Sequence, residues 1–230
     1  MREHKIKTTL FIPTFNEVVG ARLIMPRVKR EWVDEIIVVD GGSTDGTVEY
    51  FKEIGIPVIR QKSKGICDAY WECIEAATGD IIISFSPDNN SLPEAIPSLV
   101  AKMKEGYEMV IASRYLDGAK SEDDDFVTAF GNWMFTKIVN LLFGGNYTDS
   151  LVMFRAFRKD LPTRLYMGDR DIPVFEMLLC IRCAKQKLKT AEIPADEPKR
   201  VGGIRKMRPI YNGLCLLWVI VKEVFNTRDK

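Results

Sequence analysis

The sequence predicts an α/β fold built on a mainly parallel sheet that is flanked by helices. Short apolar or β-branched runs alternate with helical patterns through the first half of the 230 residues, and this order produces parallel strands covered on both faces. Hydrophobic residues make up 46% of the chain and charged residues 28%. That balance is typical of a globular domain large enough to bury its own core.

The first three elements are a strand, a helix and a second strand. An apolar run at 8–13 ends in a polar Pro-Thr-Phe-Asn-Glu loop, helical spacing follows at 18–31, and a β-branched run at 35–40 is closed by two glycines. The later predicted elements are, in order, a helix at 44–54, a strand at 57–60, a helix at 68–77, a strand at 80–85, a helix at 93–104, a strand at 108–112, a helix at 130–143, a turn and strand at 149–157, and helices at 173–186 and 209–225.

The run Asp117 to Asp125, with the sequence DGAKSEDDD, is polar and acidic. We expect a mobile surface loop at this point, because a block of like charges is usually solvated. A metal site is the alternative interpretation of the same carboxylates.

Charge and cysteine content narrow the classes of partner and compartment. The 33 basic and 32 acidic residues leave a formal net charge of +1, so the sequence predicts no nucleic-acid partner. Five cysteines lie mostly in apolar stretches, and we expect reduced thiols in the cytoplasm. The charged start of the chain followed by a short strand-like run is not a signal peptide.

Polar clusters follow three of the predicted strands, at 13–17, 40–45 and 86–90. Ligands of parallel sheets bind where the carboxyl ends of strands meet the following loops, so we expect these clusters to outline one crevice. Asp40 ends a buried strand, and a nucleoside would supply the hydrogen-bond donors that a buried carboxylate needs. A turn in which the Asp40 side chain only binds nearby backbone is the alternative, and the residues alone favour neither.

The third cluster contains Asp88 and Asn90, whose oxygens suit a divalent cation held against a diphosphate. A turn that leads into the helix at Pro93 explains the same residues without a metal.

The polar segments form an ordered set with further motifs. These are Pro13-Thr14-Phe15-Asn16-Glu17, VVDGGSTDGT, Cys67-Asp68-Ala69-Tyr70, Ala77-Thr78-Gly79-Asp80, Asp88 with Leu92-Pro93, Ser113-Arg114-Tyr115, Asp149 with Phe154-Arg155, and Arg200-Val201-Gly202-Gly203-Ile204-Arg205-Lys206. The set resembles the inverting family 2 glycosyltransferases of GT-A fold, and within them the dolichyl-phosphate mannose synthases and bacterial polyprenyl-phosphate glycosyltransferases. The resemblance covers roughly residues 8 to 225.

The resemblance implies a role for each matching residue. Six residues would bind a GDP- or UDP-sugar as donor: Pro13, Thr14, Glu17, Asp40, Ser43 and Asp68. Asp88 and Asn90 would bind Mg²⁺ or Mn²⁺, and the acceptor phosphate would be bound by Arg114, Arg200, Arg205 and Lys206. The catalytic residues would be Asp88, Arg114 and Arg200. Arginine suits phosphate because its planar fork matches two oxygens and stays charged. The implied reaction is transfer of the sugar to a polyprenyl phosphate with inversion.

Two departures from the family pattern keep other functions open. Ser86 stands where most relatives have the first Asp of an Asp-x-Asp motif, and the segment 125–132 lacks the usual arginine. A transferase with a soluble or glycan acceptor is one alternative. A catalytically weakened member that only binds nucleotide is the other.

The end of the chain combines charge and apolar surface. Residues 199–208 hold five basic side chains, and 13 uncharged residues lie between Arg208 and Lys222. As a helix they extend about 20 Å, too short to cross a bilayer core. We therefore predict a glycosyltransferase domain at 1–208 and an apolar helix at 209–230, which either lies at the cytoplasmic membrane face as a peripheral contact or packs on the core.

Overall fold

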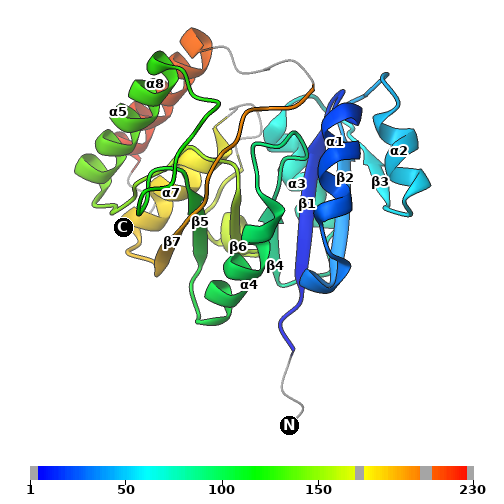
Figure 1. Cartoon of the computed structure of the whole chain (residues 1–230). Coiled ribbons are helices and arrows are strands. Elements are labelled where there is room, and N and C mark those ends of the chain that lie inside the picture. Colours follow the sequence, from blue (N-terminus) through cyan, green and yellow to red (C-terminus); the bar gives the residue numbers. More distant parts are fainter. Residues whose placement is uncertain (1–4, 169–173, 203–208, 227–230) are drawn as a thin grey trace.

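The computed structural model describes residues 5–168, 174–202 and 209–226. Its centre is a seven-stranded sheet with the strand order β3-β2-β1-β4-β6-β5-β7 (Figure 1). The strands are β1 (Thr8–Thr14), β2 (Glu35–Asp40), β3 (Val58–Arg60), β4 (Ile81–Ser84), β5 (Met109–Ser113), β6 (Arg155–Arg158) and β7 (Thr190–Pro194). The predicted class, a mainly parallel sheet flanked by helices, is confirmed.

Parallel pairing brings the ends of the predicted polar strands together. β1 pairs in parallel with both β2 and β4, and its register sets Thr14 opposite Asp40. β6 is the exception, since it runs antiparallel to β4 and β5. The carboxyl ends of β1, β2 and β4 therefore share one edge of the sheet, with their polar loops beside one another.

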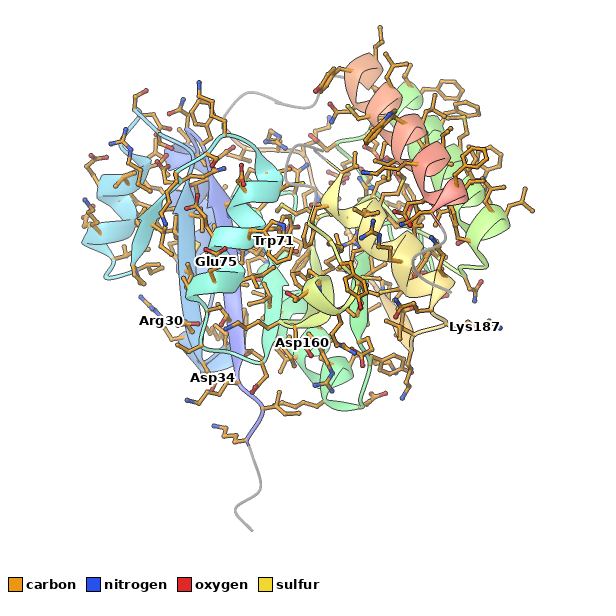
Figure 2. All side chains as sticks on the ribbon, turned by 180° about the vertical axis from the view of Figure 1, so that it is seen from behind. Arg30, Asp34, Trp71, Glu75, Asp160 and Lys187 are labelled. Carbon is orange, nitrogen blue, oxygen red and sulfur yellow. The ribbon has the colours of Figure 1, made fainter. Side chains whose placement is uncertain are left out.

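Helices cover both faces of the sheet. They are α1 (Val18–Ile24), α2 (Thr47–Glu53), α3 (Ile66–Ala76), α4 (Ile96–Lys104), α5 (Phe126–Phe143), α6 (Leu161–Arg164), α7 (Phe175–Lys185) and α8 (Pro209–Phe225), with short 3₁₀ turns at Met25–Arg27, Arg30–Trp32 and Pro93–Ala95. Figure 1 shows α1 and α4 in front of the sheet. Figure 2 shows the opposite face, where α3 carries Trp71 and Glu75. Tyr70 of α3 stacks on Phe175 of α7 with ring centroids 4.0 Å apart, which joins these two helices.

Several predicted boundaries were wrong for identifiable reasons. The helix expected at 18–31 ends at Ile24, because Pro26 lacks the amide hydrogen that a continuing helix requires. The helix expected from residue 130 begins at Phe126, since Asp125 caps it by accepting a hydrogen bond from the Thr128 amide at 2.8 Å. Strand β7 was not predicted, because it is a short edge strand with only partly buried side chains.

Helix α8 packs on the domain through a buried ion pair. The Arg182 guanidinium of α7 donates from Nη2 to Oε1 of Glu223 at 2.7 Å, and Lys185 Nζ donates to Oε2 at 3.1 Å. Glu223 is only 1% exposed. The predicted alternative of a helix packed on the core therefore describes one side of α8, whereas its other side is exposed and apolar.

We predict that Glu223→Gln lowers the free energy of unfolding by about 3 kcal/mol, because it leaves the buried Arg182 and the partly buried Lys185 without their counter-charge. Urea unfolding followed by circular dichroism measures the change. Glu53→Gln is the matched control, since Glu53 pairs with Arg22 at 3.7 Å on the open surface. An equal effect of the two variants would contradict the prediction.

The same pair should make stability depend on pH. Burial alone would raise the pKa of Glu223, but hydrogen bonds and attraction from Arg182 and Lys185 hold it below its usual 4.5. Stability from a lowered carboxyl pKa is complete above the unfolded value and is lost as the pH falls through the folded value. The advantage of the wild type over Glu223→Gln should therefore be full near neutral pH and shrink below pH 4.5. A difference that stays constant from pH 7 to pH 3 would count against it.

Candidate functional site

The end of β2 is a tightly bonded turn around Asp40. Oδ2 of Asp40 accepts hydrogen bonds from the amides of Gly42 and Ser43, both at 2.9 Å, and Oδ1 accepts one from Thr14 Oγ1 at 3.1 Å. Asp40 is 2% exposed. The side-chain turn, one of the two alternatives for Asp40, is thus present. The Ser43 hydroxyl also donates to Oδ1, so all four lone-pair directions of the carboxylate have donors, and a ligand donor would have to share or replace one of the two hydroxyl bonds.

A second set of bonds joins this turn to the loop after β1. The Asn16 amide donates to Ser43 Oγ at 2.8 Å, and Asn16 Oδ1 accepts from the Thr44 amide at 2.8 Å. The Glu17 amide donates to Thr47 Oγ1 at 2.9 Å. Asn16 adopts a φ of 56°, a left-handed conformation that asparagine tolerates. The structure therefore brings Thr14, Glu17, Asp40 and Ser43 together on one edge.

The chain after β7 crosses this edge as residues 195–202, which we call the crossing segment. In Figure 1 it runs from the end of β7 across the front of the sheet towards α1. The Val201 amide donates to the Asp88 carbonyl at 2.8 Å, and Asn89 Nδ2 donates to the Lys199 carbonyl at 2.8 Å. A Cβ atom at Gly20 would lie 2.7 Å from the Pro87 carbonyl oxygen and 2.9 Å from that of Val201. Only glycine permits α1 to approach both chains this closely.

The crossing segment places Arg200 on the predicted metal residue. Arg200 Nη1 lies 2.7 Å from Asp88 Oδ2 and 3.9 Å from Glu17 Oε1. The Asp88 side chain is 3% exposed and that of Arg200 is 24% exposed. Glu17, Asp88 and Arg200, which were predicted from separate motifs, therefore lie next to one another.

Asn90 is oriented by two carboxylates. Its Nδ2 donates to Asp123 Oδ2 at 2.9 Å and lies 3.4 Å from Glu197 Oε1. The amide nitrogen must face these acids, which turns Oδ1 away from them. Oδ1 is enclosed, and no residue in the described ranges donates a hydrogen bond to it.

This donor set fits a hard divalent cation of the predicted kind. One carboxylate and one amide oxygen are few ligands, but Mg²⁺ is commonly bound by one or two protein oxygens together with water and substrate phosphates. Within the described residues no group of three or more His, Cys, Asp or Glu side chains could hold a metal ion. A cation at Asp88 and Asn90 would therefore depend on the phosphates of a ligand.

Arg114 lies in a buried network rather than at an open phosphate site. Its Nε and Nη2 donate to the two oxygens of Asp149 at 2.6 and 3.0 Å, and Nη1 lies 3.2 Å from Glu197 and 3.5 Å from Asp124. Its side chain is 9% exposed. The expectation that Arg114 binds acceptor phosphate is therefore not supported, because three carboxylates already occupy its donors.

In this network the pKa of Asp149 is lowered and the pKa of Glu197 is raised. Burial alone would raise the pKa of Asp149, but Arg114 and the amide hydrogen bonds hold it below its usual 3.8. Burial raises the pKa of Glu197 above its usual 4.5, against the lowering effect of Arg114. One guanidinium offsets only part of the charge of three carboxylates, so Glu197 takes up a proton more readily than a solvated glutamate.

The prediction of a solvated charge run at 117–125 was wrong for two of its acids, Asp123 and Asp124. Asp124 accepts hydrogen bonds from the Tyr115 hydroxyl and from Asn132 Nδ2, and its side chain is 5% exposed. Asp123 binds Asn90 and the amide of Arg200, the latter at 3.2 Å. Sequence reasoning missed both acids as site residues. Their only signal was an acidic run next to a strand end.

The remaining predicted residues are not among those in contact with Asp40 or Asp88 described above. Pro13 lies near the end of β1, opposite Val39, and Asp68 lies in the first turn of α3 and is 8% exposed. Arg205 and Lys206 lie outside the described residues. A groove of about 440 Å³ beside β7 is lined by Leu92, Glu94, Ala95, Ser98, Ile193, Pro194, Ala195 and Asp196. It contains none of the predicted site residues.

We predict that Asp123→Ala weakens nucleoside diphosphate binding about tenfold, because it frees two residues that must be held in place. Isothermal titration with UDP and GDP in the presence of Mn²⁺ measures the change. Glu122→Ala, which removes an exposed acid from the same loop, is the control. Equal affinities of the two variants would refute the role of Asp123.

Comparisons with known proteins show the family of the chain. The family model described as Glycosyl transferase family 2 matches residues 9–163. A dolichol-phosphate mannosyltransferase of Pyrococcus furiosus is 33% identical over 215 residues, which cover 88% of this chain and 60% of that protein. A dolichyl-phosphate hexose transferase of Haloferax volcanii is 25% identical over 217 residues, covering 94% of this chain and 92% of the relative.

Solved structures support the fold. Glucosyl-3-phosphoglycerate synthase from Mycobacterium tuberculosis, in complex with Mn²⁺, uridine diphosphate and glucosyl-3-phosphoglycerate, superposes with a TM-score of 0.69 at 20% identity, covering 95% of this chain and 80% of that one. The family model spans well over half of the chain. The chain therefore belongs to glycosyl transferase family 2 and is a glycosyltransferase of GT-A fold.

Proposed function

We propose that this glycosyltransferase moves a sugar from a nucleotide-sugar to a polyprenyl phosphate with inversion. The main observation in favour of a lipid acceptor is an exposed apolar face on α5 and α8. Relatives named as dolichol-phosphate mannosyltransferase and dolichyl-phosphate hexose transferase support the same class of acceptor.

The donor side of the proposal uses the edge formed by β1 and β2. Asp40 would accept a hydrogen bond from the base or ribose of a GDP- or UDP-sugar in place of one of its hydroxyl donors, Thr14 or Ser43, with Glu17 beside it. Ser43 fixes the Asp40 carboxylate, and the turn bonds already made there keep it oriented. Such preorganisation lowers the cost of ordering the site when the donor binds.

The diphosphate of the donor would lie over Asp88, Asn90 and Arg200. Mg²⁺ or Mn²⁺ held by Asp88 and Asn90 would offset negative charge on the leaving diphosphate. Arg200 would bind phosphate oxygens through its planar fork. Ser86 contributes no charge, so this site has one carboxylate fewer than most relatives and depends more on Arg200.

The acceptor phosphate would attack the anomeric carbon in line with the leaving diphosphate. A phosphate is already ionised near neutral pH, so no general base has to remove a proton. Positioning and charge compensation then supply the rate enhancement. Arg205 and Lys206 are proposed to bind the acceptor phosphate, whereas Arg114 orders the loops beneath the site.

The apolar face consists of large side chains that the domain leaves exposed. On α5 they are Phe126, Val127, Phe130, Trp133, Leu141 and Leu142; on α8 they are Ile210, Tyr211, Leu214, Leu217, Trp218, Val221, Val224 and Phe225. The two helices contact each other and lie side by side at one end of the sheet (Figure 1). Large exposed apolar side chains gathered on two adjacent helices mark a contact with membrane or protein.

Lying at the interface fits these helices better than crossing a bilayer. In the described ranges only α5 has the length and hydropathy for a span, with 18 residues and a mean hydropathy of 1.2. However, α5 packs on α7 and α8, and its Thr136 shares a hydrogen bond of 2.9 Å with the buried Ser150. We therefore infer that α5 and α8 rest together on the cytoplasmic membrane face, with their inner sides on the domain.

An acceptor assay tests the proposed function. Purified protein, Mn²⁺ and labelled GDP- or UDP-sugars should transfer label to a polyprenyl phosphate in detergent but not to the polyprenyl alcohol, whose hydroxyl is not ionised and would need a general base. Transfer to 3-phosphoglycerate in place of the lipid would favour a soluble phosphorylated acceptor. Label that moves to neither acceptor would contradict both transfer reactions.

We predict that the double substitution Leu214→Ser and Trp218→Ser reduces binding to anionic liposomes at least about tenfold, because each exposed side chain contributes apolar burial. Liposome flotation measures it. Leu23→Ser, which removes an exposed apolar residue of α1, is the matched control. Unchanged flotation of the double variant would rule out α8 as a membrane contact.

A further inference from the structure

Arg200 and a divalent cation compete for the same carboxylate. Arg200 Nη1 is 2.7 Å from Asp88 Oδ2, and Asp88 Oδ1 accepts the Asn90 amide at 3.1 Å. A cation on Asp88 would have to share Oδ2 with the guanidinium or displace it. Like charges on one carboxylate repel, so each weakens binding of the other.

The backbone around Arg200 is fixed, whereas its side chain has a donor to spare. The Arg200 amide donates to Asp123 Oδ1 at 3.2 Å, and the next amide donates to the Asp88 carbonyl. Nε of Arg200 is enclosed, and no described residue accepts a hydrogen bond from it. A buried guanidinium nitrogen without an acceptor is costly, and a phosphate oxygen would satisfy it.

The orphan oxygen of Asn90 is the complementary signal. Oδ1 has no donor among the described residues, while its amide nitrogen is held by Asp123. An acceptor without a donor and a donor without an acceptor therefore belong to the two residues that contact the Asp88 carboxylate. A diphosphate with its cation would satisfy both, since the cation takes the oxygen and the phosphate takes the guanidinium.

We propose that Arg200 binds Asp88 in the free protein and transfers to the donor diphosphate, so that Asp88 accepts the divalent cation only together with nucleotide. This inference rests on the proposed nucleotide-sugar function. Arg200 thus acts as an internal counter-ion for Asp88 in place of the cation. It couples the two ligands, because each removes the obstacle to the other.

The proposal makes an unusual prediction for Arg200→Gln. Removing the arginine should raise the affinity of the free protein for Mn²⁺ alone by about tenfold, since no charge-assisted contact has to be broken first. The same change should weaken binding of UDP or GDP in the presence of Mn²⁺ by at least about tenfold. A merely structural role of Arg200 would weaken both.

Electron paramagnetic resonance of free Mn²⁺, titrated with protein in the absence of nucleotide, measures the first effect, and calorimetry measures the second. Arg27→Gln is the control, because it removes an arginine bound to Glu94 at 2.8 Å outside the site and should change neither affinity. Arg200→Lys, which keeps the charge, should give a smaller gain for Mn²⁺. Asp88→Asn should abolish the gain in the Arg200→Gln background.

The outcomes separate this inference from the proposed function. An unchanged or lower Mn²⁺ affinity of Arg200→Gln would overturn the inference, as would nucleotide affinity that does not fall. If the wild type binds neither UDP nor GDP with Mn²⁺, both the proposed donor site and the proposed transfer of Arg200 from Asp88 to the diphosphate are wrong. If both titrations behave as expected but no polyprenyl phosphate is glycosylated, only the proposed acceptor is wrong.

Discussion

The buried guanidinium of Arg114 is the interaction on which the site depends. It follows β5 and binds Asp149 before β6, Asp124 of the acidic loop, and Glu197 after β7. A buried cation without partners is strongly unfavourable, so these three segments are held where their carboxylates reach it. Once Glu197 and the acidic loop are fixed, Asn90 and the crossing segment have a defined place beside Asp88.

Two parts of the molecule therefore meet at Asp88: the edge of β1 and β2, and the part that is held by the contacts of Arg114. The edge of β1 and β2 is rigid through local turn bonds, as in the contacts of Asp40 with Thr14 and Ser43. The other part is held by ionic contacts between segments distant in the sequence, and the apolar face of α5 and α8 lies on its outer side. This division suits the proposed reaction, in which a soluble donor would bind on one side and a lipid acceptor on the other.

Much of the fold could be predicted because its signals are local. The runs that became β1, β2 and β4 are continuous and apolar, and their polar ends mark the edge that collects Thr14, Asp40 and Asp88. The network around Arg114 could not be predicted in the same way. Its partners lie up to 83 residues from Arg114 in the sequence. The residues next to an arginine in the sequence do not reveal whether carboxylates or phosphates bind it. The acidic loop was misinterpreted for the same reason, since its cationic partner lies outside the run.

We infer that a nucleoside diphosphate binds at Asp88, where the crossing segment meets the edge of β1 and β2. The most direct measurement is a crystal structure of the protein with Mn²⁺ and UDP or GDP. We expect the nucleoside to lie against Thr14 and Asp40 and the diphosphate beside Asp88, with Arg200 turned towards the phosphates. A nucleotide bound in the groove beside β7, against Glu94 and Asp196, would contradict it.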